Sequence, residues 1–260
     1  MEQRGDAETA HDNAAAHWAA QAGALGWQVR RTAGWTAVRG ADDHRVVVTR
    51  PYADPAALEE ELAGLFREWD TRQLCLEDPY CGLDLTRFGG EASLPQAVMV
   101  REAGPVAERE RREGSPGEPR AAGAGLVVVS EALDGDGLAV VERAVVEGFP
   151  LAARLPWRRG SLLPPVLLGV DGWRAWAAWR DGAPAGGCVS YDDGSAVGLY
   201  WVATLPEHRS RGVARTLVSA VLTAHPDSRA TLTATLFGEP LYRRLGFAEQ
   251  ALSRWWRVSR

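Results

Sequence analysis

The sequence lacks lysine, so all 29 of its Lys-plus-Arg side chains are arginines. A Schiff-base enzyme and a pyridoxal enzyme each need a lysine amine, and a phosphate-loop nucleotide site needs the lysine of its G-x-x-x-x-G-K motif. These classes are therefore excluded. The net charge of −5 gives the chain no overall positive field, which argues against a nucleic-acid partner.

Cysteine and histidine are too few and too scattered to indicate a metal centre. The three cysteines are Cys75, Cys81 and Cys188, and the first two do not have C-x-x-C spacing. The five histidines form no H-x-x-x-H or H-E-x-x-H group, so we expect reduced thiols and no metal. No apolar run approaches the roughly 20 residues of a membrane span. The N-terminal stretch does not resemble a secretory signal, so we predict a cytoplasmic protein without a membrane partner.

A charged stretch rich in glycine and proline, from Gly104 to Gly125, interrupts the pattern of apolar residues. Such a composition without periodicity is typical of a linker. We therefore predict an N-terminal α/β half over residues 1–104, a flexible linker over residues 105–122 and a C-terminal domain over residues 123–260.

The N-terminal half is predicted to contain helices and strands but shows no catalytic constellation. Composition favours a helix over residues 7–25, and residues 44–50 and 95–102 are typical of strands. Between the two strands, Asp54 and Pro55 suit the N-cap and first position of a helix whose apolar residues recur every three or four positions.

The C-terminal half alternates strands and helices in an order that predicts a mixed sheet. A strand at residues 125–132 and a helix at 134–150 precede three strand-like runs between Trp173 and Thr204, which Asp-containing turns join into an antiparallel meander. The turn before the third run contains Asp192 and Asp193. The meander is followed by a helix, a strand, a short helix that ends near Gly246 and a closing strand. The strand–helix–strand step implies one pair of parallel neighbours.

Arginines gather at the start of the helix that follows the meander, in the stretch "HRSRGVARTL". A helix N-terminus is the positive end of the helix dipole, so cations are unfavourable there unless an anion is present. The first amides of a helix lack intrahelical partners, and Gly212 would let an anion approach the backbone. The stretch therefore suits a phosphate or pyrophosphate. Taken alone, it could equally be a solvated arginine surface beside a turn.

Two motifs of the C-terminal half resemble those of the GCN5-related N-acetyltransferases, the acetyl-CoA-dependent GNAT family. They are "VATLPEHRSRGVARTL" and "LTATLFGEPLYRRLGF", in the family's order and spacing. With the meander, the resemblance covers residues 125–256. It implies the α+β GNAT fold, in which helices flank a mostly antiparallel mixed sheet with one splayed parallel strand pair. The N-terminal half faintly echoes the same fold, so we expect a tandem arrangement with a degenerate, structural half that shapes the acceptor side.

The resemblance also implies a coenzyme A site. The family signature Q/R-x-x-G-x-G/A matches Arg209, Gly212 and Ala214, whose loop amides would hold the pyrophosphate. The strand before the loop would pair with the pantetheine arm. Many members carry an asparagine seven residues before a tyrosine in Y-x-x-x-G-F, and this sequence departs from the family there, with a threonine. The implied cofactor-binding residues are Val202, Ala203, Thr204, Arg209, Arg211, Gly212, Val213, Ala214, Thr235 and Tyr242.

The chemistry implied by the family is direct attack of an amine on the thioester carbonyl of acetyl-CoA. The backbone N–H of Val202 would stabilise the oxyanion, and Tyr242 would protonate the leaving sulfur. The sequence does not identify a general base, and a chain of water molecules would suffice to remove the amine proton. Glu147 could bind a cationic amine, act as the base, or be a solvated acid at a helix end. Tyr200, placed by strand alternation on the face of Val202 and Thr204, could border the acceptor pocket or pack in the core.

These observations predict an acyltransferase that moves acetyl from acetyl-CoA to a primary amine, as a monomer or homodimer, without metal, nucleic acid or membrane. The alternative is a non-catalytic acyl-CoA-binding module that senses the cofactor or scaffolds a partner. The threonine at position 235 and the missing base leave this alternative open, whereas Tyr242 with Gly246 and Phe247 favours catalysis. The sequence does not identify the acceptor, since fold does not determine it.

Overall fold

The computed structural model describes residues 5–40, 44–71, 73–106, 125–149, 151 and 154–259. The predicted linker lies almost entirely outside the described residues. The helices are α1 (Asp6–Ala24), α2 (Pro55–Glu68), α3 (Gly135–Gly148), α4 (Val213–Ala224) and α5 (Glu239–Arg244). The strands are β1 (Gln28–Arg31), β2 (Trp35–Arg39), β3 (His44–Val48), β4 (Gln73–Asp78), β5 (Gly90–Ala92), β6 (Gln96–Arg101), β7 (Val127–Glu131), β8 (Trp173–Arg180), β9 (Ala183–Asp192), β10 (Val197–Thr204), β11 (Ala230–Ala234) and β12 (Ala248–Ser259).

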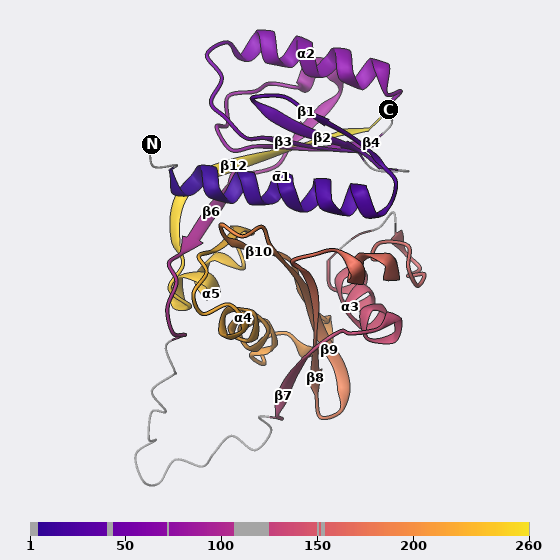
Figure 1. The fold of residues 1–260 in the computed structure, drawn as a ribbon, viewed down its shortest axis with the longest axis vertical. Coiled ribbons are helices and arrows are strands. Elements are labelled where there is room, and N and C mark those ends of the chain that lie inside the picture. Colours follow the sequence, from indigo (N-terminus) through magenta and orange to yellow (C-terminus); the bar gives the residue numbers. More distant parts are fainter. Residues whose placement is uncertain are drawn as a thin grey trace.

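The strands form one continuous sheet, in the order β1-β2-β3-β4-β12-β6-β11-β10-β9-β8-β7, with β5 paired to β12 (Figure 1). Strand β12 comes from the C-terminal part of the chain, yet it pairs with β4 and β6 of the N-terminal part. Strand β6 in turn pairs with β11. Each part of the chain therefore supplies a strand that the other needs to complete its sheet.

The predicted mixed, mainly antiparallel sheet is confirmed. Strands β8, β9 and β10 form the antiparallel meander, and β10 is parallel to β11. The predicted cap at Asp54 is also present, and Asp134 caps α3 in the same way. The carboxylate of Asp54 accepts a hydrogen bond from the amide of Ala57 at 3.1 Å, and that of Asp134 accepts one from Gly137 at 2.8 Å. Gly246, at φ 88°, follows the end of α5 in the left-handed region.

Helix α1 lies between the two parts of the molecule (Figure 1). It packs on β2, β3 and β6 of the N-terminal part and on β10 of the C-terminal part. A helix that is covered from two sides needs small side chains rather than one apolar stripe, and the buried residues of α1 include Ala10, Ala15, Ala19 and Ala22. The helix predicted from composition is confirmed, and its place at the centre explains why it is rich in alanine.

The other helices cover the outer faces of the sheet. Helix α2 packs on the N-terminal strands through Leu62, Leu65 and Phe66. In the C-terminal part, α3 and the end of α1 share one apolar core, whereas α4 and α5 share the core on the opposite face. Strand β10 therefore has α1 and α3 on one face and α4 and α5 on the other.

Candidate functional site

Strands β10 and β11 separate after a short paired segment. Their parallel register joins Val197 to Ala230 and Gly198 to Thr231, and within the described residues it goes no further. Strand β11 continues along β6 to the pair of Ala234 and Ala97. The edge of β10 that faces β11 is therefore left without strand partners from residue 199 onward, and an amide-bearing ligand could pair with it.

A bulge interrupts β10 at the same place. The register with β9 shifts between Tyr200 and Ala203, and Trp201 has φ 56°, in the left-handed region. The extra residue places Tyr200 and Trp201 on the same face, toward α1 and α3, while Val202 packs on the α4 face. The prediction that strand alternation puts Tyr200 on the face of Val202 is therefore wrong, because a bulge breaks the period of two.

The conformation of Trp201 is costly and is held by its neighbours. A bulky residue in the left-handed region costs about 1–3 kcal/mol. The Trp201 ring packs edge-on against Phe149 and Trp18, at centroid distances of 6.0 and 6.3 Å. The Arg45 guanidinium lies 5.6 Å from the centroid of the same ring. Backbone strain of this kind is typical of functional sites, so the bulge marks the part of β10 most suited to chemistry.

The N-terminus of α4 has the geometry of an anion site. Gly212 is its N-cap residue at φ 81° and ψ 1°, and a Cβ at this position would have no heavy atom within 4 Å. The first hydrogen bond of the helix runs from the amide of Thr216 to the carbonyl of Gly212 at 3.0 Å. The three amides before Thr216 therefore have no acceptor within the helix. The backbone here is unobstructed, and its contact with a phosphate stays a prediction.

The arginines of this loop take different places. Arg209 donates from Nη2 to the carbonyl of Gly148, at 3.0 Å, and so ties the loop to the C-terminal end of α3. Arg211 is exposed beside Gly212. Of these two predicted contacts, Arg211 is thus the side chain with free access to an anion at the helix start, whereas Arg209 fixes the loop.

Tyr242 is buried on the α4 face of the sheet, next to the splayed strands. Its side chain is 8% exposed, belongs to the same core as Val197 and Leu199, and packs edge-on against Phe247 with ring centroids 5.9 Å apart. Burial raises the pKa of Tyr242 above its ordinary value, and the neighbouring Cys188 thiol adds to this. Thr235 stabilises the turn that precedes the helix of Tyr242, because its Oγ1 accepts a hydrogen bond from the amide of Gly238 at 3.2 Å.

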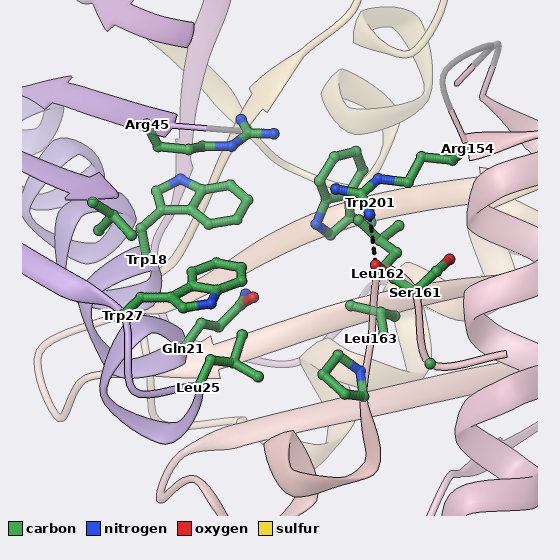
Figure 2. Close-up of a pocket in the computed structure, with 13 residues that line it drawn as sticks. Trp18, Gln21, Leu25, Trp27, Arg45, Arg154, Ser161, Leu162, Leu163 and Trp201 are labelled. Atoms are coloured by element: carbon green, nitrogen blue, oxygen red, sulfur yellow. Dashed lines mark hydrogen bonds between the residues drawn. The ribbon is translucent and has the colours of Figure 1, made fainter. Parts of the chain in front are cut away.

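Trp201 also lines a cavity of about 160 Å³ between the two parts of the molecule (Figure 2). The N-terminal part contributes side chains from α1 and from the strands that follow it. The C-terminal part contributes Trp201 and the segment after α3. The lining residues are Trp18, Gln21, Leu25, Trp27, Val38, Arg45, Arg154, Gly160, Ser161, Leu162, Leu163, Pro164 and Trp201.

The predicted acceptor residue Glu147 is not one of these lining residues. Its Oε1 accepts a hydrogen bond at 3.0 Å from Nε of Arg143, one turn earlier on α3. The structure thus places Glu147 in an ion pair on the surface of α3. Tyr200, the other candidate, is covered by α1.

The side chain of Glu142 shapes the cavity, although the sequence analysis does not single it out. Glu142 is fully buried on α3. Its carboxylate accepts hydrogen bonds from the Trp157 indole at 3.1 Å and from the amides of Gly160, Leu162 and Leu163 at 2.7, 2.6 and 2.9 Å. It therefore holds the loop that forms one wall. Its position four residues after Leu138, on the apolar stripe, is the signal that could have found it, since a buried carboxylate needs partners.

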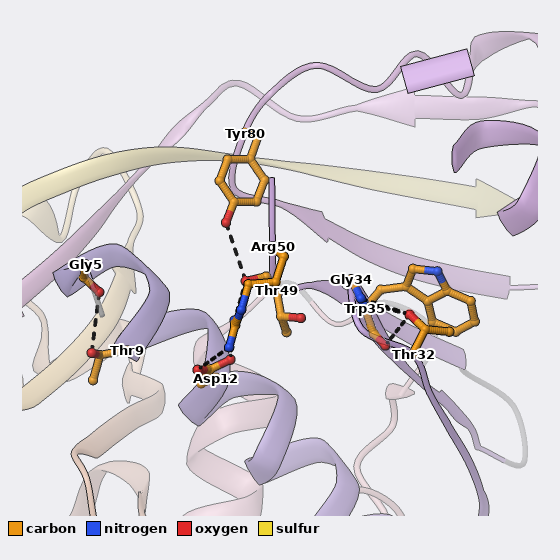
Figure 3. Close-up of polar contacts among 9 residues, drawn as sticks. All are labelled: Gly5, Thr9, Asp12, Thr32, Gly34, Trp35, Thr49, Arg50 and Tyr80. Carbon is orange, nitrogen blue, oxygen red and sulfur yellow. Dashed lines mark hydrogen bonds and ion pairs between the residues drawn. The ribbon is translucent and has the colours of Figure 1, made fainter. Parts of the chain in front are cut away.

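Polar contacts fix α1, which forms the opposite wall, from both sides. Toward the C-terminal part, Asn13 donates to the carbonyl of Ala196 at 3.0 Å and accepts from the Tyr200 hydroxyl at 2.6 Å. The ring of His17 stacks on Tyr200 at 3.8 Å, and burial holds the pKa of His17 well below its ordinary value. Toward the N-terminal part, Asp12 accepts from both terminal nitrogens of Arg50 at 2.7 and 3.0 Å (Figure 3).

The described residues show neither a metal-binding cluster nor a helix that could span a membrane. Residues 171–249 match the model of the acetyltransferase (GNAT) domain. No curated protein matches the sequence significantly.

Several solved structures share the fold at low sequence identity. A GCN5-related N-acetyltransferase from Kribbella flavida is 19% identical, with a TM-score of 0.60 over 94% of this chain and 95% of that one. A GCN5-related N-acetyltransferase-like protein from Streptococcus suis is 12% identical, with a TM-score of 0.55 over 88% and 87%. A GCN5-related N-acetyltransferase from Sphaerobacter thermophilus is 17% identical, with a TM-score of 0.51 over 86% and 76%. Residues 171–249 of this chain therefore match a GNAT domain, and the chain as a whole shares the fold of these solved structures.

Proposed function

We propose that this protein is an acetyl-CoA-dependent N-acetyltransferase that acetylates a primary amine. The observation that carries the proposal is the bulged, splayed strand β10. On one face it adjoins α4 and Tyr242, and on the other the Trp201 side chain forms part of a cavity. A cofactor bound along the open strand edge and an acceptor in the cavity would meet at the bulge.

The residues around Gly212 fit coenzyme A. The amides of residues 211–214, which span the loop and the start of α4, would hold the pyrophosphate together with the exposed Arg211. The unpaired edge of β10 over residues 202–204 would bind the amides of the pantetheine arm. Acetyl-CoA is the co-substrate and supplies the thioester.

The backbone of the bulge and the phenol of Tyr242 supply the remaining groups. At the bulge, the amide of Val202 is available to stabilise the oxyanion that forms when the amine attacks the carbonyl. The raised pKa of Tyr242 keeps its phenol protonated throughout the physiological range, so the hydroxyl can protonate the departing thiolate. No carboxylate or histidine lines the described cavity, so the amine proton is lost to water.

The N-terminal part is proposed to serve the acceptor rather than the cofactor. Trp18, Gln21 and Arg45 from this part line the cavity, whereas the proposed cofactor residues all lie beyond residue 200. This arrangement supports the expectation of a structural half that shapes the acceptor side.

Thiol release from acetyl-CoA, followed with a panel of amines, tests the proposed function. Tyr242→Phe is expected to lower kcat by about 10²-fold or more while leaving the Kd of coenzyme A nearly unchanged. Tyr80→Phe, in the N-terminal part and outside the residues that line the cavity, is the matched control and is expected to keep full activity. Coenzyme A binding without thiol release for any amine would instead indicate a non-catalytic acyl-CoA-binding module. An unchanged kcat in Tyr242→Phe would remove the tyrosine from the mechanism.

A further inference from the structure

The cavity beside Trp201 has an unusual balance of groups. Its walls carry three tryptophans, at positions 18, 27 and 201, together with aliphatic side chains. Its only charged lining residues within the described chain are Arg45 and Arg154. Figure 2 shows Arg45 over Trp18 on one wall and Arg154 beside Trp201 on the other. An apolar cavity that contains cations but no acid repels a cationic ligand and favours one that carries a negative charge.

Arg45 lies near a buried acid and over the ring of Trp18. Its guanidinium lies 4.1 Å from the centroid of the Trp18 ring, a cation–π distance. Glu77 is buried nearby on β4, and burial raises the pKa of Glu77, an effect that the charge of Arg45 offsets only in part. Arg45 therefore has a tryptophan ring and a buried acid as neighbours, in contrast to Arg154.

Arg154 is held in position by a backbone carbonyl. Its Nη1 donates to the carbonyl of Ser161 at 2.5 Å, which directs the guanidinium across the cavity wall (Figure 2). Within the described part of the chain, no carboxylate pairs with it. The loop of Ser161 is itself fixed by the bonds to Glu142. A guanidinium has further N–H donors in a planar fork, which match the two oxygens of a carboxylate.

We propose that the acceptor is a small amine that also bears a carboxylate on an apolar, preferably aromatic, body. The carboxylate would bind Arg154, the body would lie among the tryptophans, and the amine would face the bulge at Trp201. The cavity of about 160 Å³ is smaller than the roughly 300–1,000 Å³ of a drug-sized ligand site, which suits a single amino acid. Acetylation of this ligand rests on the proposed function, whereas its binding in the cavity does not.

Matched ligands with and without the carboxylate test the proposal. L-Phenylalanine and phenethylamine differ only in that group, and binding to the full-length protein without acetyl-CoA can be followed by tryptophan fluorescence, because three tryptophans line the cavity. L-Phenylalanine is expected to bind about 10- to 100-fold more tightly, as for a charge-assisted hydrogen-bonded pair. Equal or tighter binding of phenethylamine would overturn the proposal.

Two variants assign the effect to Arg154. Arg154→Gln is expected to remove the preference, by raising the Kd and the KM of L-phenylalanine about 10- to 100-fold with little change in kcat. Arg158→Gln, an exposed neighbour outside the cavity, is the control and should retain the preference. Equal losses in both variants, or equal effects on both ligands, would contradict the role of Arg154. If L-phenylalanine binds selectively but no thiol is released, the proposed function fails while the carboxylate site stands.

Discussion

Replacing Gly212 by glutamate is the sharpest test of the coenzyme A site. Gly212 has φ 81°, and a Cβ there meets no heavy atom within 4 Å, so a longer side chain would project into the open space at the start of α4. A carboxylate about 4 Å from one phosphate charge would be repelled by about 4 kcal/mol at an effective dielectric constant of about 20. This corresponds to a rise of about a thousandfold in Kd, which surface screening reduces, so we expect at least about 100-fold.

The structure offers a matched control for the backbone. Any side chain in the left-handed region costs about 1–2 kcal/mol of stability, whatever its charge. Gly89 has φ 80° and ψ 20°, also with nothing within 4 Å of a Cβ, and it lies in the N-terminal part. Gly89→Glu should therefore lose similar stability and bind coenzyme A normally. Gly212→Gln keeps the length of the side chain without the charge, and a smaller rise in Kd is expected.

Titration calorimetry with coenzyme A measures the affinities, and thermal unfolding by circular dichroism measures the stabilities. The reasoning requires Gly212→Glu to remain folded and to lose affinity. If its Kd stays within about threefold of the value for Gly89→Glu, the electrostatic argument is refuted, and the pyrophosphate does not bind at α4.

Two further predictions concern buried groups. Glu142→Gln leaves loop amides without acceptors, so we expect it to lower the free energy of unfolding in urea by about 2–3 kcal/mol. The KM of the acceptor should rise, whereas the Kd of coenzyme A should be nearly unchanged. An equal loss of coenzyme A affinity would show that the loop serves more than the acceptor. Burial lowers the pKa of His11 from 6.5 to about 4, so below pH 6.5 the unfolded chain binds a proton that the folded chain refuses, and stability is lost as the pH falls toward 4. Between pH 7 and pH 5 this loss is about 2 kcal/mol. In His11→Phe, the free energies of unfolding in urea at the two pH values should differ by that much less than in the unsubstituted protein. An unchanged slope would mean that His11 is not the group that titrates.

Much of the fold could be predicted because local signals and final structure agree. Asp54 and Asp134 cap the helices that their positions indicate, and the Asp-containing turns at 181 and 192 join the strands of the meander. The loop around Gly212 also follows from local chemistry, since a glycine in the left-handed region and a helix start are both visible in a short stretch. These features depend on neighbours in the sequence, which the reader of a sequence can see.

The cavity proposed for the acceptor could not be predicted because it is assembled from distant segments. The bulge that turns Trp201 toward the cavity has no glycine to mark it, and strand alternation points Tyr200 to the wrong face. Trp18 and Arg45 reach the same cavity only because α1 is held between the two parts of the sheet. Burial on two sides removes the apolar stripe by which a helix is normally placed. A search confined to the motif-bearing half therefore finds the proposed cofactor site and misses its opposite wall.

The exchange of strands has a consequence for biosynthesis. Strands β4 and β6 leave the ribosome long before β12, yet β12 is the strand that lies between them. During translation, both therefore expose backbone edges that cannot yet be covered, and unpaired edges invite aggregation. The N-terminal part cannot complete its sheet while it is being translated, because β4 and β6 pair with residues 248–259, which are synthesised last. On a ribosome stalled before those residues, most of both parts would be synthesised, but the sheet of each would lack β12.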